Sequence, residues 1–127
     1  MLKRLVVILF VGGLVLAAGQ VMADDQQKAL EWYQKGNTTF SLAKQVEYYT
    51  KAIELVPNWA YPYNNRGVAY YHLGEFEKAK ADFDKALGLK PGYNLALTNR
   101  AGANFNKKEA AMEVWESSYL DRLAAGF

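Results

Sequence analysis

The amino-acid sequence predicts an all-α fold, a short solenoid of about three helix-turn-helix repeats that ends in a C-terminal capping helix. Two observations lead to this prediction: a pattern that recurs after 34 residues, and a helical spacing of apolar residues within each repeat. The composition agrees, because 51% hydrophobic and 14% aromatic residues in a chain of 127 residues supply the core of one small domain.

The chain begins with a segment that has the layout of a signal peptide. Lys3 and Arg4 precede an apolar run, and Val21 and Ala23 stand three positions and one position before a cleavage point in front of Asp24. The alternative is an uncleaved inner-membrane anchor over residues 5–22, a length close to the ~20 residues that span a bilayer. We expect residues 1–23 to be a signal peptide or anchor, and residues 24–127 to form the repeat domain in a bacterial envelope, most simply the periplasm.

Charge and composition exclude several classes of function. The full chain has 15 Lys and Arg against 13 Asp and Glu, and cleavage would remove two of the cations. A balanced charge argues against nonspecific nucleic-acid binding, and we expect membrane contact only through an uncleaved first segment. We interpret the charged residues between Glu75 and Lys85, including Asp82 and Asp84, as a solvated helix face.

Catalytic and metal-binding chemistry has little support in the sequence. The chain has no cysteine, which excludes a thiolate metal site, a cysteine nucleophile and a lipid-modified cysteine, and its one histidine is His72. No phosphate-binding loop or nucleophile elbow is present. We therefore expect no enzyme activity, no catalytic residue, no metal and no cofactor, and we interpret His72 as a groove or surface residue.

The first repeat unit, which ends at Pro57, has a shortened turn. Its glycine and closing proline, Gly36 and Pro57, are 21 residues apart, whereas the corresponding separation in the next unit is 24 residues. Either a tight turn forms near Ser41 or one helix runs through. The poor helix formers at residues 37–39 favour the turn.

The central unit, which begins at residue 60 and ends at residue 92 or 93, divides into two helical patterns around Leu73-Gly74-Glu75. Glycine favours the end of the first helix, and an acidic residue suits the start of the second. The 34-residue recurrence continues into this unit: Lys51, Ala52, Leu55 and Pro57 return as Lys85, Ala86, Leu89 and Pro91.

The third unit starts near Ala96 and has apolar residues at helical spacing up to Phe105. Asn106 and Glu109 then have the spacing of an N-cap and its reciprocal acid, which predicts a short turn. A final amphipathic helix with Val114, Trp115 and Leu123 on its apolar face would cover the open end of the stack.

The central unit resembles a tetratricopeptide repeat. The resemblance extends over roughly residues 26–123, and one departure is Arg66, where an aliphatic residue is common. The matching positions are Tyr63, Gly67, Tyr70, Ala79, Phe83, Ala86 and Pro91, with Leu73-Gly74-Glu75-Phe76 in the turn.

The resemblance implies that the first helices of successive units line a concave groove. Amide side chains can bond both N–H and C=O groups of an extended peptide, and tyrosines add contact area at low entropic cost. For the tyrosines, packing against neighbouring helices is an equal alternative. The candidate ligand-binding residues are Tyr33, Asn37, Asn64, Asn65, Val68, Tyr71, His72, Thr98 and Asn99.

Some members of this family grip the C-terminal carboxylate of a chaperone with cations and asparagines in the groove. Asn37 and Asn65 stand at suitable positions, but Tyr33, Leu95 and Asn99 occupy the places of the cations. This argues against binding of a chaperone tail.

The sequence therefore predicts a noncatalytic adaptor that binds a protein or peptide in its concave groove. One alternative is a structural subunit of an envelope assembly that uses its ends or convex face, and self-association through an open end is possible. A second alternative is a glycan binder that uses Tyr61, Tyr71 and neighbouring amides.

Overall fold

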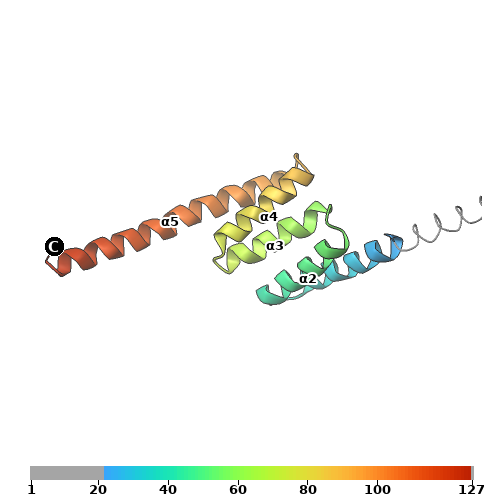
Figure 1. Ribbon diagram of the computed structural model, residues 1–127, viewed down its shortest axis with the longest axis horizontal. Helices are drawn as coiled ribbons and strands as arrows, with labels where there is room; N and C mark the ends of the chain where they lie inside the picture. Colours follow the sequence, from blue (N-terminus) through green and yellow to red (C-terminus); the bar gives the residue numbers. More distant parts are fainter. Residues whose placement is uncertain (1–21, 127) are drawn as a thin grey trace, which may run out of the picture.

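The computed structural model describes residues 22–126, and over this range it is an all-α solenoid (Figure 1). Successive helices run in opposite directions and stack side by side, as the sequence predicts. The predicted signal peptide or anchor lies almost wholly outside the described range. Within that range, none of the helices combines the length and the apolar character that a membrane crossing requires. The helices are 22–38, α2 (Leu42–Leu55), α3 (Ala60–His72), α4 (Phe76–Leu89) and α5 (Asn94–Ala124).

The first turn is short, and the helices on either side of it are separate, which confirms the tight turn expected near Ser41. The Ser41 hydroxyl accepts a hydrogen bond from the backbone N–H of Lys44 at 3.4 Å, so Ser41 is the N-cap of α2. The Gln45 amide donates to the carbonyl of Thr39 at 2.9 Å and satisfies a carbonyl in the turn.

Glycine allows the two helices of a repeat to approach closely. A Cβ atom on Gly67 would lie 2.7 Å from the ring of Phe83, and one on Gly36 would lie 2.4 Å from the ring of Tyr49. Both rings are buried, with 1% of Phe83 and 4% of Tyr49 exposed. The aromatic ring of each second helix therefore occupies the space left by the missing side chain on the first.

The turn between α3 and α4 is a Schellman motif. Gly74 has a φ of 76°, its N–H donates to the carbonyl of Tyr71 at 3.0 Å, and the N–H of Glu75 donates to the carbonyl of Tyr70 at 2.9 Å. These bonds satisfy the last carbonyls of α3, so the predicted role of Gly74 in ending the helix is confirmed.

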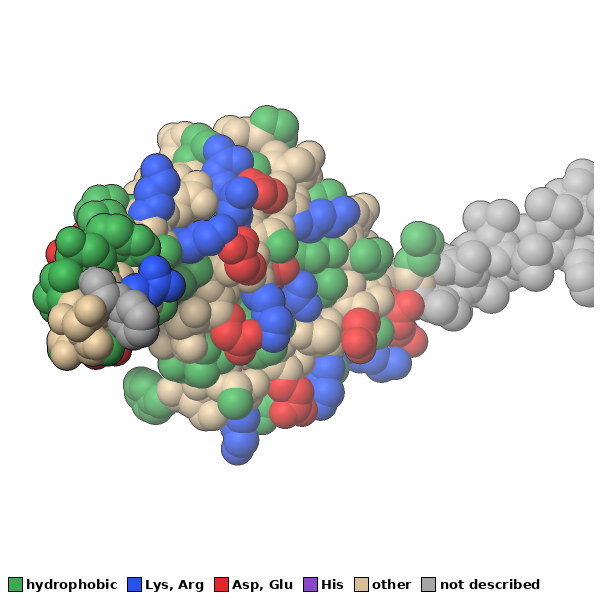
Figure 2. Space-filling model, turned by 60° about the vertical axis from the view of Figure 1, so that its left-hand side comes forward, with side chains coloured by type: hydrophobic (Ala, Val, Ile, Leu, Met, Phe, Trp, Pro, Cys, Tyr) green, Lys and Arg blue, Asp and Glu red, His purple; other side chains and the backbone are tan. Residues whose placement is uncertain are grey.

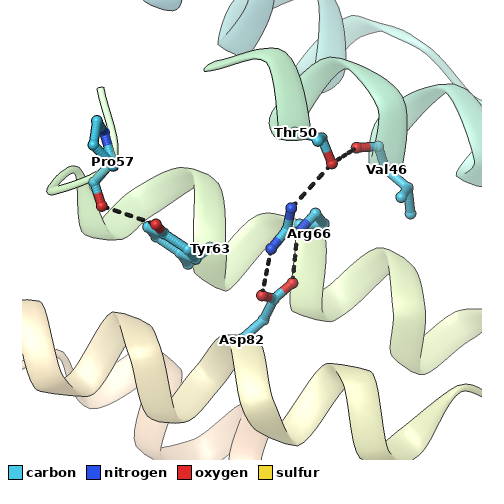
Figure 3. A network of polar contacts seen from close by, with 6 residues as sticks. All are labelled: Val46, Thr50, Pro57, Tyr63, Arg66 and Asp82. Atoms are coloured by element: carbon cyan, nitrogen blue, oxygen red, sulfur yellow. Dashed lines mark hydrogen bonds and ion pairs between the residues drawn. The ribbon is translucent and has the colours of Figure 1, made fainter. Parts of the chain in front are cut away.

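A buried ion pair joins α3 to α4, and it corrects the interpretation of Asp82 as a solvated charge. The Arg66 guanidinium donates two hydrogen bonds to the Asp82 carboxylate, both at 2.8 Å, and a third to the Thr50 hydroxyl at 3.0 Å (Figure 3). Only 6% of Asp82 is exposed. Hydrogen bonding to Asp82 raises the pKa of Arg66. This pairing explains how the central repeat accommodates arginine where the family commonly has an aliphatic residue.

Helix α5 continues without interruption for 31 residues, so the turn predicted at Asn106–Glu109 does not form. Asn106 donates its amide to the hydroxyl of Tyr71 and is not an N-cap. The residues that follow, up to Met112, are strong helix formers without glycine or proline, so nothing in this stretch ends the helix. The C-terminal half of α5 therefore projects away from α3 and α4 (Figure 1) and does not cover the end of the stack.

Candidate functional site

Four asparagines form a hydrogen-bonded chain across the first helices of the three repeats, which we call the amide ladder: Asn37, Asn65, Asn64 and Asn99. The Asn99 amide donates to the Asn64 carbonyl at 3.0 Å, and the Asn64 amide donates to the Asn65 carbonyl at 3.2 Å. The Asn65 amide donates to the Asn37 carbonyl at 3.2 Å. Each amide thus serves as donor to the next, an arrangement in which hydrogen bonds strengthen one another.

Two tyrosines fix the N-terminal end of the amide ladder. The Tyr49 hydroxyl donates to the Asn37 carbonyl at 2.8 Å, and the Asn65 amide also donates to the Tyr33 hydroxyl at 3.1 Å. Burial raises the pKa of Tyr49, which keeps its hydroxyl protonated as a donor. The Tyr33 ring packs against Trp59 with ring centroids 4.7 Å apart. Tyr33 therefore serves both as a packed aromatic and as a hydrogen-bond acceptor beside the ladder.

A hollow of about 190 Å³ lies between α3 and α5 at the C-terminal end of the amide ladder. Both apolar and polar side chains line the hollow, and none of its lining residues is Lys, Arg, Asp or Glu. The lining residues are Val68, Tyr71, His72, Phe83, Thr98, Asn99 and Gly102.

The structure brings all nine candidate residues into these two adjoining groups. Tyr33 and the four asparagines belong to the amide ladder and its contacts, while Val68, Tyr71, His72 and Thr98 line the hollow, and Asn99 belongs to both. Their accessibility differs. His72, Thr98 and Asn37 are exposed, Tyr33, Asn65, Val68, Tyr71 and Asn99 are half-buried, and Asn64 is 1% exposed.

Asn64 therefore cannot contact a ligand in the way the sequence predicts. Its carbonyl accepts from Asn99 and its amide donates to Asn65, so both polar groups are engaged inside the stack. Its place in the ladder orients Asn65 and Asn99, whose side chains reach the surface of the groove.

Two residues that were not predicted for the groove line the hollow or contact its lining: Phe83 and Asn106. Phe83 is one of the positions that match the repeat pattern, and it also lines the hollow. The 34-residue period could have indicated Asn106, because it relates Asn106 to His72. Because α3 ends at His72, the same period predicts that the first helix of the third unit extends at least to Asn106.

Over residues 22–126, no three His, Cys, Asp or Glu side chains are grouped so that they could hold a metal ion. The chemistry that the groove does offer is hydrogen bonding from amides, together with contact to tyrosine rings and a small apolar surface.

Comparison with known proteins identifies relatives that share the repeat. The chain is 37% identical to RNA polymerase II-associated protein 3 of Rattus norvegicus over 89 residues, which are 64% of this chain and 13% of that protein. It is 25% identical over 108 residues to a TPR repeat-containing protein of Rhizobium etli, covering 72% of this chain and 52% of that protein. The chain thus spans a small part of the first of these relatives and about half of the second.

A solved structure has the same fold. The first TPR of Spaghetti (RPAP3), solved with the HSP90 peptide SRMEEVD, superposes with a TM-score of 0.64 at 31% identity, covering 66% of this chain and 69% of that one. The family model described as "Tetratricopeptide repeat" matches residues 60–93, which coincide with the central unit predicted from residue 60 to residue 92 or 93. The helical stack, the glycine and aromatic contacts within each repeat, and these matches together show that the chain is a member of the tetratricopeptide repeat family.

Proposed function

We propose that the chain is a noncatalytic adaptor that binds an uncharged, extended peptide segment of a protein partner along the amide ladder and in the adjoining hollow. The similar domain of Spaghetti (RPAP3) was solved with a peptide bound, which supports a peptide as the class of ligand. The observation that supports the site most directly is that five of the nine candidate residues line one hollow of about 190 Å³.

The chemistry of the groove favours an uncharged segment over an acidic tail. The hollow has no Lys or Arg in its lining. Asn99 donates one amide hydrogen to Asn64, which leaves its second amide hydrogen and its carbonyl oxygen for a peptide backbone, and Asn65 keeps one carbonyl lone pair. A carboxylate placed here would lose its hydration without gaining a cationic partner, which is unfavourable. We expect the peptide SRMEEVD to bind this groove poorly.

The experiment is a selection from a library of random nine-residue peptides with the full chain as bait. Selected peptides should be poor in Asp and Glu, and Thr98→Arg should weaken their binding by about tenfold or more, because the new side chain fills the hollow. Ala81→Arg is the matched control, since residue 81 is exposed on α4, outside the hollow. Binding should be unchanged in that variant.

Two outcomes would contradict the groove proposal. If the selected peptides end in acidic residues and SRMEEVD competes with them, the ligand is a carboxylate tail. If Thr98→Arg and Ala81→Arg bind equally well, the ligand contacts another face, and a structural role through the ends or convex face becomes the better explanation.

A glycan ligand has weaker support than a peptide. Tyr61 and Tyr71 are ten residues apart on α3, which is about 15 Å along the helix axis, so they offer no shared stacking surface. The Tyr61 hydroxyl also accepts a hydrogen bond from Lys90 at 2.7 Å, which engages its polar end.

We also propose that the chain is exported to a bacterial envelope, on the basis of its N-terminal sequence. The cations at residues 3 and 4, the apolar run and the small residues before Asp24 support a cleaved signal peptide. Mass spectrometry of the chain purified from a bacterial periplasmic fraction should show a mature N-terminus at Asp24. An intact N-terminus in the membrane fraction would support the anchor over residues 5–22.

A further inference from the structure

The face of α5 that points away from the stack carries a nearly continuous apolar stripe along the whole helix. We call it the α5 stripe, and its six large apolar side chains are each between 41% and 67% exposed: Leu97, Phe105, Met112, Trp115, Tyr119 and Leu123. Ala101 and Lys108 complete the row, and both are exposed. The opposite face of α5 packs on the stack through buried Ala96 and Ala103 and through an ion pair of Arg100 with Asp84.

The spacing along the α5 stripe is symmetric. The stripe consists of residues 97, 101, 105, 108, 112, 115, 119 and 123. The successive separations along it are four, four, three, four, three, four and four residues. The steps read the same from either end, and their centre is residue 110. A row with this property is complementary to a second copy of itself in the antiparallel direction, which is the requirement for a two-fold interface.

The residues that would face one another in such a pair fit in size. Ala101 stands opposite Tyr119 of the second copy, a small residue against a large one, and Phe105 stands opposite Trp115. Leu97 would meet Leu123 at each end. In the centre, the Lys108 stem would lie on Met112 with its ammonium within reach of Glu109 and Glu116 of the second copy.

The chain cannot cover the stripe by folding back on itself without breaking α5. A hairpin would need a turn between Phe105 and Met112, and this stretch contains no glycine or proline. The helix is continuous over 31 residues, roughly 46 Å. Figure 2 shows the resulting hydrophobic surface on the projecting end of α5, at the left of the view. Trp115 and Tyr119 stack there with ring centroids 5.4 Å apart.

We propose that two copies of the chain pair through their α5 helices in an antiparallel two-fold arrangement, in which residues 110–124 of each copy cover residues 97–108 of the other. Each copy then supplies the helix that the third repeat of its partner lacks. The pairing covers the C-terminal end of both stacks at once. It therefore produces a closed dimer and does not propagate into a filament. The stripe lies beside the groove residues and does not include them, so the pairing is independent of the proposed peptide function.

Cysteine cross-linking tests the register directly, because the natural chain contains no cysteine. The full chain is expressed in intact cells in two forms, each with a different tag after the C-terminus, and treated with a short bismaleimide. Leu97→Cys on one form and Leu123→Cys on the other should link, as should Lys108→Cys with Met112→Cys. Leu97→Cys on both forms should not link, because these positions would be about 39 Å apart.

A matched pair of substitutions tests the stripe itself. In the Lys108→Cys and Met112→Cys forms, Leu123→Glu should reduce the cross-linked product by about tenfold or more, because it places a carboxylate in the apolar contact. Leu120→Glu should leave the product unchanged, since Leu120 is exposed on α5, at 62% against 53% for Leu123, but lies off the stripe. Both side chains are exposed in the single copy, so neither change should unfold it.

Each other outcome would overturn the proposal. Linking of Leu97→Cys to itself would indicate a parallel pair. Linking of Leu97→Cys and Leu123→Cys within one doubly substituted chain would indicate a hairpin. An absence of links between tagged copies, or equal loss in both glutamate variants, would show that the α5 stripe does not contact a second copy.

Discussion

At the scale of single residues, the interior of the stack depends on a few contacts that a sequence pattern does not display. Asp82 and Asp84 are two positions apart on α4, and each accepts from an arginine 16 positions away. The Arg66–Asp82 pair is buried, with side chains 17% and 9% exposed, whereas the Arg100–Asp84 pair is 38% and 46% exposed. The same chemistry therefore has two different environments on one helix.

This contrast predicts different effects of the same substitution. Asp82→Ala should lower the free energy of unfolding by about 3 kcal/mol, because it leaves the Arg66 guanidinium buried without its partner. Asp84→Ala should cost less than about 1 kcal/mol, because water replaces the exposed pair. Urea denaturation of both variants measures the difference, and equal losses would refute a special role for burial at Asp82.

Close packing at Gly67 leads to a second prediction. Gly67→Ala should destabilise the fold by about 2 kcal/mol, because the new methyl group would overlap the buried ring of Phe83. Gly88→Ala is the control within α4, where a Cβ meets nothing within 4 Å, and it should stabilise by roughly 1 kcal/mol. Thermal unfolding followed by circular dichroism should show shifts of opposite sign, and shifts of the same sign would contradict the packing explanation.

At the scale of elements, the positions of the turns decide where one helix ends and the next begins. The α3–α4 turn has both a left-handed glycine and its two Schellman hydrogen bonds, and the turn before α2 has the Ser41 cap. The stretch from Phe105 to Met112 has neither, and α5 runs through it. The presence or absence of these local devices explains the unequal lengths of the helices.

The left-handed backbone at Gly74 gives a prediction at this scale. Gly74→Ala should cost about 1 kcal/mol through backbone strain alone, since a Cβ there meets nothing within 4 Å. Gly92→Ala, in a turn without a positive φ and equally open, should be close to neutral. Denaturation midpoints of the two variants provide the comparison. A neutral Gly74→Ala would mean that the turn adopts another conformation.

At the scale of the whole molecule, the stability of a repeat stack follows from how many neighbours each helix has. Helix α3 packs against α2, α4 and α5, whereas the C-terminal half of α5 projects beyond the stack. Backbone amides of α3 should therefore exchange most slowly with solvent. Residues 110–124 should exchange fastest at low protein concentration.

Hydrogen exchange followed by mass spectrometry at two protein concentrations measures both effects. The order of protection among helices should hold at each concentration, and protection of residues 110–124 should increase at the higher one if two copies pair. Uniform protection along the chain would contradict a stack stabilised by neighbours.

Much of this architecture was predictable because it depends on local and periodic features. The 34-residue recurrence relates Pro57 to Pro91 and requires stacked copies of one unit, whatever the detailed contacts are. Glycine at positions 67 and 74 permits a close approach of two helices in one case and a left-handed turn in the other. Residue types at these positions are sufficient for the prediction.

The tertiary structure alone decided which polar groups meet. Asp82 belongs to a row of charges that looks solvated in sequence, and its burial depends on Arg66 from another helix. The amide ladder joins asparagines up to 35 positions apart, so the burial of Asn64 and the exposure of Asn37 could not be read from spacing. The sequence by itself determined the repeat and the helical character of its segments, because these depend on the 34-residue recurrence and on the helical spacing of apolar residues. The ion pair, the ladder and the uncovered stripe of α5 depend on how separate helices are rotated and packed, which only the folded chain specifies.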